Sequence, residues 1–141
     1  MPIESSEVLK CQAVMGDLLI CEGGEAGRAA VWPHQEPICF QNHIHRVRCF
    51  GGISPFFIYW FFQYLNCTGE IDLYRKGIGI TNMSGKALGS IPVPLPPLDE
   101  QQRIVIKIDE LMAQCDQLKI SLGLIEQSHM LLTDAMLENA V

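Results

Sequence analysis

The apolar residues in the last third of the chain follow a regular spacing. Between residues 104 and 136 they recur at gaps that alternate between four and three residues. This 3.5-residue repeat keeps one stripe of a helix turned toward a partner, so it predicts a long helix that pairs with another helix in a coiled coil. The predicted dimer seam consists of Ile104, Ile108, Leu111, Cys115, Leu118, Leu122, Ile125, His129 and Leu132, and it continues to Met136.

The start of this helix is marked in the sequence. Pro96 and Pro97 cannot continue a helix, and Asp99 and Glu100 place negative charge at the positive end of the helix that follows. If the helix runs from about residue 99 to about residue 139, a rise of about 1.5 Å per residue makes it roughly 60 Å long. A small domain cannot bury the seam of so long a helix.

A second apolar stripe lies roughly 160° around the same helix. It contains Ile106, Ala113, Ile120, Leu124 and Leu131. The first half of this stripe, near Ile106, could equally pack on the chain's own N-terminal part or contact a partner. Because Ile120, Leu124 and Leu131 lie farther along the helix, we predict that they dock a different protein.

The N-terminal part alternates short apolar runs with turn residues, a pattern typical of mixed strands and helices. Residues 17–21 and 28–32 are two such runs on either side of the turn at Gly23 and Gly24, and they predict a β-hairpin. Residues 40–49 predict a third strand, although their alternation is imperfect.

A short helix is expected at the centre of this part. Ser54 can cap it, the proline that follows suits its first turn, and the run FFIYWFFQYL is apolar nearly all round, so we expect the helix to be buried. Residues 76–82 predict a loop or an edge strand, and Ser84 predicts a helical turn. The prolines in residues 91–95 allow only an edge strand or an extended connector.

Composition fits one folded domain, because the 141 residues are 48% apolar and 18% charged. No run is as long as a membrane span and no signal pattern precedes the first strand, so we expect a soluble cytoplasmic protein. The six cysteines form no C-x-x-C pair, and we interpret them as buried free thiols of a reducing compartment. His43 and His45 are interpreted as a structural pair, since no third metal ligand is indicated, and no metal site is predicted.

Charge is distributed unevenly along the chain. The net charge is −6, of which residues 1–98 carry −1, from seven basic and eight acidic residues, and residues 99–141 carry −5, from three and eight. This net negative charge argues against loose, charge-driven binding to nucleic acid. The nearly neutral N-terminal part still has basic points that could contact phosphates in a specific complex, namely Arg28, Arg46, Arg48, Arg75, Lys76 and Lys86.

Motifs for catalysis are missing from the sequence. The run GGEAGR at residues 23–28 lacks the Gly-Lys-Ser/Thr of a phosphate loop and does not match the dinucleotide fingerprint, so it is interpreted as a turn. No set of Ser, His and acid stands out, and His129 in the seam is interpreted as a polar layer that fixes register. We therefore predict that the chain is not an enzyme.

Three stretches resemble the specificity subunit of type I restriction-modification enzymes. They are IPVPLPPLDEQQRIVIKIDELMAQCDQL at residues 91–118, GDLLICEGGEAGRAAVW at 16–32 and ICFQNHIHRVR at 38–48, and the resemblance covers almost the whole chain. Together with the elements above, it implies an α+β fold. A small mixed α/β recognition domain, residues 1–95, would be followed by one long C-terminal helix, residues 96–141, that forms an antiparallel coiled coil.

The resemblance implies a target recognition domain that reads one half of a split double-stranded DNA sequence. Its partners would be methyltransferase (modification) subunits, with the restriction subunit as an indirect partner. S-adenosylmethionine, ATP and magnesium would belong to the partner subunits, so no cofactor is expected in this chain.

We nominate seven side chains as DNA contacts because Arg, Lys, Asn and Gln suit phosphates and base edges. They are Arg28, Gln41, Asn42, Arg46, Arg48, Lys76 and Asn82. The open alternative is that the two adjacent amides satisfy backbone groups at a strand end and that the arginines are ordinary solvated surface.

The chain departs from the family pattern, in which a complete subunit has two recognition domains and two helices and a segment precedes the GDLLI strand. We expect a truncated half-subunit that lacks the segment before the GDLLI strand. Pairing of the long helix does not need this segment, whereas DNA reading would normally use part of it. In an antiparallel homodimer Leu122 would pack near Ile125 of the partner, Leu118 near its His129 and Cys115 near its Leu132. A different function is also open, namely a scaffold or decoy that reads no DNA and pairs through its long helix with specificity or methyltransferase subunits.

Overall fold

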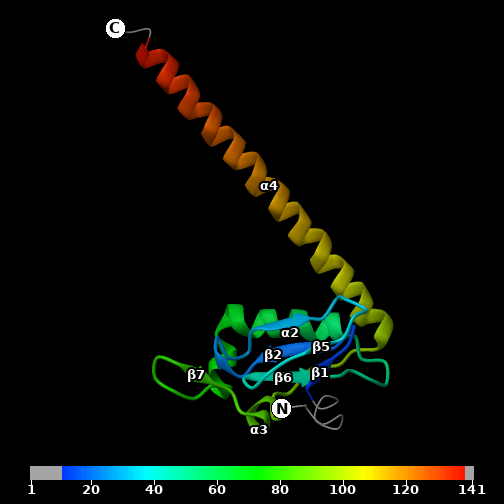
Figure 1. Cartoon of the computed structure of the whole chain (residues 1–141). Helices are drawn as coiled ribbons and strands as arrows, with labels where there is room; N and C mark the ends of the chain where they lie inside the picture. The colour runs from blue at the N-terminus through cyan, green and yellow to red at the C-terminus, as the bar shows by residue number, and fades with distance from the viewer. Residues whose placement is uncertain (1–10, 139–141) are drawn as a thin grey trace. The chain divides into compact units, whose positions relative to one another are not determined.

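The computed structural model describes residues 11–138, with the side chains of 132 and 134–138 left out (Figure 1). The chain divides into two compact units, the head, Met1–Val105, and the tail, Ile106–Val141. No helix within the described range combines the length and the apolar character needed to cross a lipid bilayer.

A three-stranded antiparallel sheet forms the centre of the head. Its strands are β2 (Leu18–Cys21), β4 (Ala29–Val31) and β6 (Ile44–Val47), in the order β4-β2-β6. The predicted hairpin is confirmed, since Leu19 of β2 lies opposite Ala30 of β4. The predicted third strand is also confirmed, although it is shorter than expected.

Two minor pairings extend this sheet region. β1 (Gln12–Ala13) pairs with β5 (Ile38–Cys39), and β3 (Gly23–Gly24) pairs with β7 (Thr81–Asn82). The glycine run expected to form a turn therefore also contributes a short strand, because its backbone groups find partners on a segment almost 60 residues later.

Helix α2 (Pro55–Thr68) covers the three-stranded sheet (Figure 1). It begins as predicted, with the Ser54 side chain accepting a hydrogen bond from the backbone of Phe57, and it ends at Gly69, whose φ of 78° closes the last turn. A 3-10 turn, η1 (Glu70–Tyr74), follows.

Only one face of α2 is buried, which corrects the expectation of a helix buried on all sides. Phe56 and Tyr64 are exposed on the other face, since a single helix lying on one sheet has one protein neighbour. The core forms between the inward face of β2, which contributes Leu18 and Ile20, and the buried face of α2, with Ile71 and Met83 beside them. The buried α2 residues are Phe57, Ile58, Phe62 and Leu65.

A short helix and an extended connector lead from the sheet to the long helix. Ser84 caps α3 (Gly85–Leu88) by accepting a hydrogen bond from the backbone of Ala87, as expected. The segment of residues 91–95 is a connector without strand pairing, and Ile91 anchors it in the core.

The cysteines are free thiols, as expected, but their predicted burial is wrong. Cys21 and Cys49 are half-buried, and four others are exposed: Cys11, Cys39, Cys67 and Cys115. Of the exposed ones, Cys39 lies on a short strand and Cys67 and Cys115 lie on outer helix faces, where an apolar sequence neighbourhood does not produce burial. For the half-buried Cys49, loss of solvation raises the thiol pKa, so this group stays protonated and poorly reactive.

Helix α4 (Leu98–Glu138) begins inside the head. Gln101, 2% exposed, accepts a hydrogen bond from the backbone of Ser54 at 2.9 Å and donates to the carbonyl of Pro96 at 2.8 Å. Ile104 and Val105 pack against the core of the head. For Ile104, contact within its own chain therefore competes with the predicted seam.

Beyond the head, Ile108 of the seam is half-buried, and the apolar residues of α4 that follow it are exposed as far as their side chains are described. Leu118, Leu122 and Ile125 of the seam are each more than half exposed, and Ile106 of the second stripe is 60% exposed. The same is true of the three residues predicted to dock another protein, Ile120, Leu124 and Leu131. Leu132 and Met136 lie outside the residues whose side chains are described. The antiparallel coiled coil stays a prediction.

Candidate nucleic-acid interface

Three loops meet at one end of the sheet. At the end of β2, Cys21 lies opposite Ile44, the first residue of β6, and the backbone of Glu22 bonds both to His43 (2.7 Å) and to Met83 (2.8 Å). These bonds bring together residues 22–28, 40–43 and 76–82. We call the surface formed by these residues the three-loop edge.

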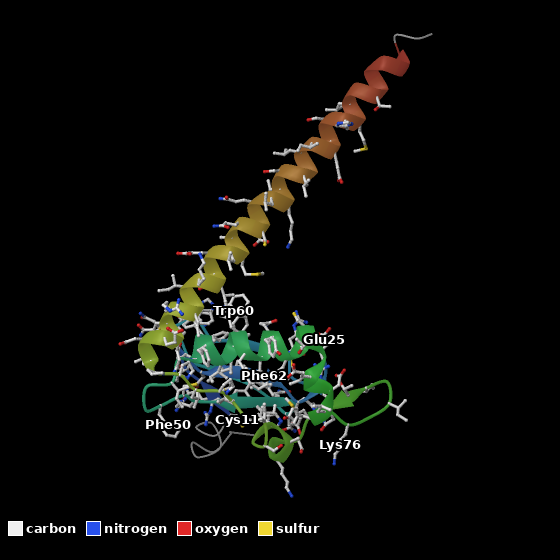
Figure 2. All side chains as sticks on the ribbon, turned by 180° about the vertical axis from the view of Figure 1, so that it is seen from behind. Cys11, Glu25, Phe50, Trp60, Phe62 and Lys76 are labelled. Carbon is white, nitrogen blue, oxygen red and sulfur yellow. The ribbon has the colours of Figure 1, made fainter. Side chains whose placement is uncertain are left out.

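Residues 76–82 form a closed hairpin on this edge. Lys76 and Asn82 exchange backbone hydrogen bonds of 2.8 and 2.7 Å, and the Thr81 hydroxyl donates to the carbonyl of Gly24 at 2.6 Å. Asn82 also lies opposite Gly23 in the β3-β7 pair. The base of the hairpin is thereby fixed to the sheet, and Figure 2 shows Lys76 at the root of the projecting loop.

Five of the seven nominated DNA contacts are exposed on the three-loop edge: Arg28, Gln41, Asn42, Lys76 and Asn82. They come from all three loops, so residues more than 50 positions apart in the chain share one surface. Figure 2 shows Glu25 and Lys76 at this end of the head and Phe50 at the opposite end.

The Arg28 guanidinium forms an ion pair with Glu25, and both side chains are about 70% exposed. The hydrogen bond from the guanidinium to this carboxylate raises the pKa of Arg28, which is charged at any physiological pH. An exposed pair three residues apart in the chain contributes little stability. Arg28 can therefore exchange Glu25 for a phosphate at low cost.

The two remaining nominees, Arg46 and Arg48, have bonds within the head. Arg48 donates two hydrogen bonds of 2.7 Å to the carboxylate of Asp17, which is 1% exposed, and Arg46 donates to the backbone of Gln12. The Arg48 hydrogen bond holds the pKa of Asp17 below its usual value, against the opposing effect of burial. These arginines hold together elements away from the three-loop edge.

Arg75, which was not nominated as a DNA contact, supports the three-loop edge through hydrogen bonds. It bonds to the carbonyl of Ala26, to the side chain of Asn66 and, at 2.8 Å, to Asp72. Asn66 in turn donates to the carbonyl of Gly27 at 3.0 Å. This network connects α2 and η1 to the loop that carries Arg28. A polar hollow of about 560 Å³ lies here, lined by Gly24, Glu25, Arg28, Gln63, Asn66, Arg75 and Thr81.

Sequence reasoning missed His43 as part of this edge. Its φ of 78° is unusual for a residue other than glycine, and with Ile80, Thr81 and Asn82 it lines a second hollow on the edge. The only sequence signal was the turn-forming Asn42 beside it. His45, by contrast, bonds through Nε2 to the Met83 carbonyl at 2.8 Å and is structural, as expected.

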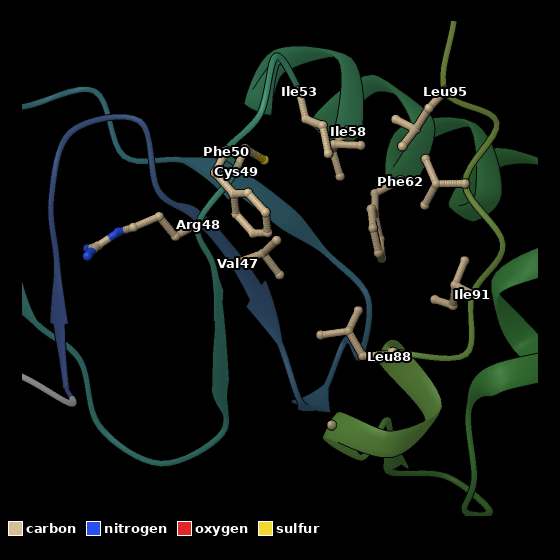
Figure 3. Close-up of a pocket in the computed structure, with 13 residues that line it drawn as sticks. Val47, Arg48, Cys49, Phe50, Ile53, Ile58, Phe62, Leu88, Ile91 and Leu95 are labelled. Carbon is tan, nitrogen blue, oxygen red and sulfur yellow. The ribbon is translucent and has the colours of Figure 1, made fainter.

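An apolar groove of about 400 Å³ lies elsewhere on the head (Figure 3). Val47, Cys49 and Phe50 line it from one side, and Ile91 and Leu95 line it from the other. Its one charged lining residue, Arg48, points away from it (Figure 3) and bonds to Asp17. The groove has no chemistry for a polyanion, which leaves the three-loop edge as the candidate interface.

Comparisons with known proteins agree with the resemblance of the sequence. A family model, the type I restriction modification DNA specificity domain, matches residues 10–125. The type I restriction enzyme EcoAI specificity subunit of Escherichia coli is 31% identical over 102 residues, which are 72% of this chain and 16% of that protein.

Two solved structures are similar to this chain. One, from work on complex assembly and conformational transition of the type I R-M system, has a TM-score of 0.65 and 27% identity, over 78% of this chain and 26% of that chain. The HsdS subunit from Thermoanaerobacter tengcongensis has a TM-score of 0.63 and 26% identity, over 78% and 25%. This chain thus spans a minor part of the length of its relatives. Because the family model covers most of its residues, the chain belongs to the type I restriction modification DNA specificity domain family.

Proposed function

We propose that this chain is a DNA-recognition module of a type I restriction-modification system and reads one half of a split target sequence. The observation that carries the proposal is the three-loop edge, on which exposed amide and cationic side chains gather in a chain of the specificity-domain family. The chain supplies recognition and no catalysis. Methylation, with S-adenosylmethionine, and the ATP- and magnesium-dependent steps belong to partner subunits.

The chemistry of the edge suits both parts of a duplex. Gln41, Asn42 and Asn82 carry amides, which can pair with adenine in the major groove through two hydrogen bonds. Lys76 and Arg28 suit phosphates, which position the module without reading sequence. The cations are few, so binding depends on specific contacts more than on general attraction, in keeping with the net charge of −6.

The long helix is proposed to assemble the complex. Its seam pairs antiparallel with a second copy, which would present two recognition heads to the two halves of a split site. Lys119 then lies close to Glu126 of the other copy, a complementary surface pair of modest strength. The second stripe, at Ile120, Leu124 and Leu131, docks the methyltransferase subunit, and the restriction subunit joins indirectly.

The test is selection of duplexes from a random-sequence pool by the purified chain, alone and with a methyltransferase subunit. We expect a short preferred sequence to be enriched. Asn42→Ala and Asn82→Ala should each weaken binding to it about tenfold, the loss that follows from removing one good base contact, and should relax the preference at one position. Gln117→Ala, an exposed amide on α4, is the matched control and should change neither. Absence of enrichment under both conditions contradicts the proposal.

A scaffold or decoy is the second candidate, and the exposed apolar seam of the acidic tail favours it. In this case the chain captures specificity or methyltransferase subunits through its helix and reads no DNA. Capture of those subunits in a pull-down, combined with failure to enrich any duplex, would select this function over DNA reading.

A further inference from the structure

The tip of the hairpin on the three-loop edge carries the most exposed apolar side chain of the head. Ile78 is fully exposed, at 105%, and Ile80 is 78% exposed. Scattered exposed apolar residues are ordinary on protein surfaces. These two are unusual because they lie between Lys76 and Asn82, on a hairpin whose base is bonded to the sheet.

The backbone of the hairpin is built to hold Ile78 outward. Gly77 and Gly79 flank it with φ values of 114° and 87°, a region that other residues rarely adopt. A Cβ at Gly77 would collide with the carbonyl oxygen of Ile80, so only glycine allows the chain to turn this tightly. The tip is therefore a defined turn with an apolar end, and its position follows from the fixed base.

The surroundings of the tip indicate the chemistry of its partner. An apolar protein surface would call for a contiguous patch of several hundred Å². The tip instead is a small apolar point on an edge that otherwise exposes a cation and amides, at Lys76, Asn42 and Asn82. This combination of side chains fits a polyanion that also presents small apolar groups between hydrogen-bonding ones.

The major groove of DNA has this character. It is about 12 Å wide and admits a two-stranded ribbon, whereas the minor groove, about 6 Å wide, does not. The apolar group that it presents among the base edges is the C5-methyl group of thymine. A hairpin that enters with its base, the Lys76–Asn82 bridge, near the phosphates brings its tip to the base edges.

We propose that Ile78 reads a thymine methyl group in the major groove and so determines one base of the target. The inference depends on the proposed DNA-reading function and deepens it. The hairpin acts as the probing element, the amides of the neighbouring loops bond to adjacent bases, and Ile78 distinguishes thymine from cytosine at its position by contact with the methyl group.

The experiment uses the full chain and the duplex that it enriches from the random pool. Each thymine in this duplex is replaced in turn by deoxyuridine, which lacks only the methyl group. For the unmodified protein, one replacement should weaken binding about fourfold, as expected for exposing one buried methyl group. Ile78→Ala should weaken binding to the thymine duplex at least as much. With Ile78→Ala, the same deoxyuridine should cause no further loss, because the two changes remove one contact.

Control variants separate this contact from general effects. Leu73→Ala removes three carbon atoms, as Ile78→Ala does, from an exposed side chain of η1 and should bind both duplexes as the unmodified chain does. Ile78→Val, which keeps the branch at Cβ and removes only the terminal methyl group, should retain most of the discrimination. Since Ile78 touches no core residue, the thermal unfolding of all three variants should match that of the unmodified chain.

Each outcome decides a separate question. If no duplex is enriched, the DNA-reading function itself fails. If a duplex is enriched and Ile78→Ala binds it unchanged, or binds it more weakly with every deoxyuridine loss still present, the inference is overturned while the function stands. Loss of self-association in Ile78→Ala with DNA binding intact would assign the tip to a protein contact and would equally overturn it.

Discussion

Asp17 is the most deeply buried acid of the described chain, and its surroundings keep it ionised. Its carboxylate accepts two hydrogen bonds from Arg48 and one from the backbone of Val14. The Arg48 hydrogen bond lowers its pKa despite burial. A carboxyl group whose pKa is lower in the folded state stabilises the fold above its unfolded pKa, and this contribution is lost as the pH falls through the folded pKa.

This residue gives a pH-dependent prediction. Asp17→Asn should lower the free energy of unfolding by about 2 kcal/mol at neutral pH, because the carboxylate charge and one of its two hydrogen bonds with Arg48 are lost. The difference from the unmodified chain should shrink as the pH falls below about 4, where the unfolded carboxyl protonates, and should vanish below the folded pKa. Urea unfolding across this range measures it. Glu100→Gln, which breaks an exposed pair with Arg103, is the control and should change stability little. A constant difference at all pH values would contradict this account.

At the scale of single residues, sequence reasoning succeeded where the signal was local. Ser54 with the proline after it marked the start of α2, and Ser84 marked that of α3. It could not identify the Asp17–Arg48 pair, whose members lie 31 positions apart, and it considered Arg48 only as a DNA contact or as solvated surface. An arginine in an isolated sequence looks the same whether its partner is a phosphate or a buried acid.

Among the elements, α4 is joined to the rest of the head by the hydrogen bonds of one buried polar side chain, Gln101, as well as by the packing of Ile104 and Val105. Gln101→Ala should lower the free energy of unfolding by about 1–3 kcal/mol, because the backbone N–H of Ser54 and the carbonyl of Pro96 lose their partner in a half-buried site. Gln102→Ala, the exposed neighbour, should stay within about 0.5 kcal/mol. Urea unfolding followed by circular dichroism compares the two. Equal effects of the two substitutions would mean that the Gln101 hydrogen bonds do not contribute to the stability of the fold.

The seam of α4 gives a prediction about assembly. Replacing Leu118 and Leu122 together by glutamate should convert a dimer into monomers in sedimentation velocity, since charge cannot be buried in the a and d layers. The same replacement of Ile120 and Leu124, on the second stripe of the same helical segment, should leave the dimer intact. A dimer that survives the first change, or is lost equally with both, would contradict the assignment of the seam.

The elements that the sequence predicted well are those whose spacing or capping is local. The heptad pattern and the two prolines gave the long helix almost to its ends. The pairings of β1 with β5 and of β3 with β7 were not predicted, because each joins two residues to two others far along the chain and leaves no periodic signal. For the same reason, the sequence allowed single residues of the three-loop edge to be nominated but did not predict that the three loops lie together.

For the whole molecule, the division of charge predicts how salt should act. The part that would bind DNA is nearly neutral on average, so few counterions are released on binding. Lys76→Gln should weaken binding to all duplexes alike and reduce the slope of log affinity against log salt by about one, as for a single phosphate contact. Lys107→Gln, in the acidic helix, should leave the slope unchanged. A sequence-dependent loss with Lys76→Gln would instead make this lysine a base-reading residue.

The mutual backbone bonds between Lys76 and Asn82, together with the pairing of Thr81 with Gly24, separate residues 77–80 from the sheet. We expect a change in the length or composition of residues 77–80 to leave the core undisturbed, since both ends of this segment leave the sheet region at the same place. The tip of the hairpin can thus be exchanged as a unit. Grafting it between relatives offers a way to alter target preference without redesigning the protein that carries it.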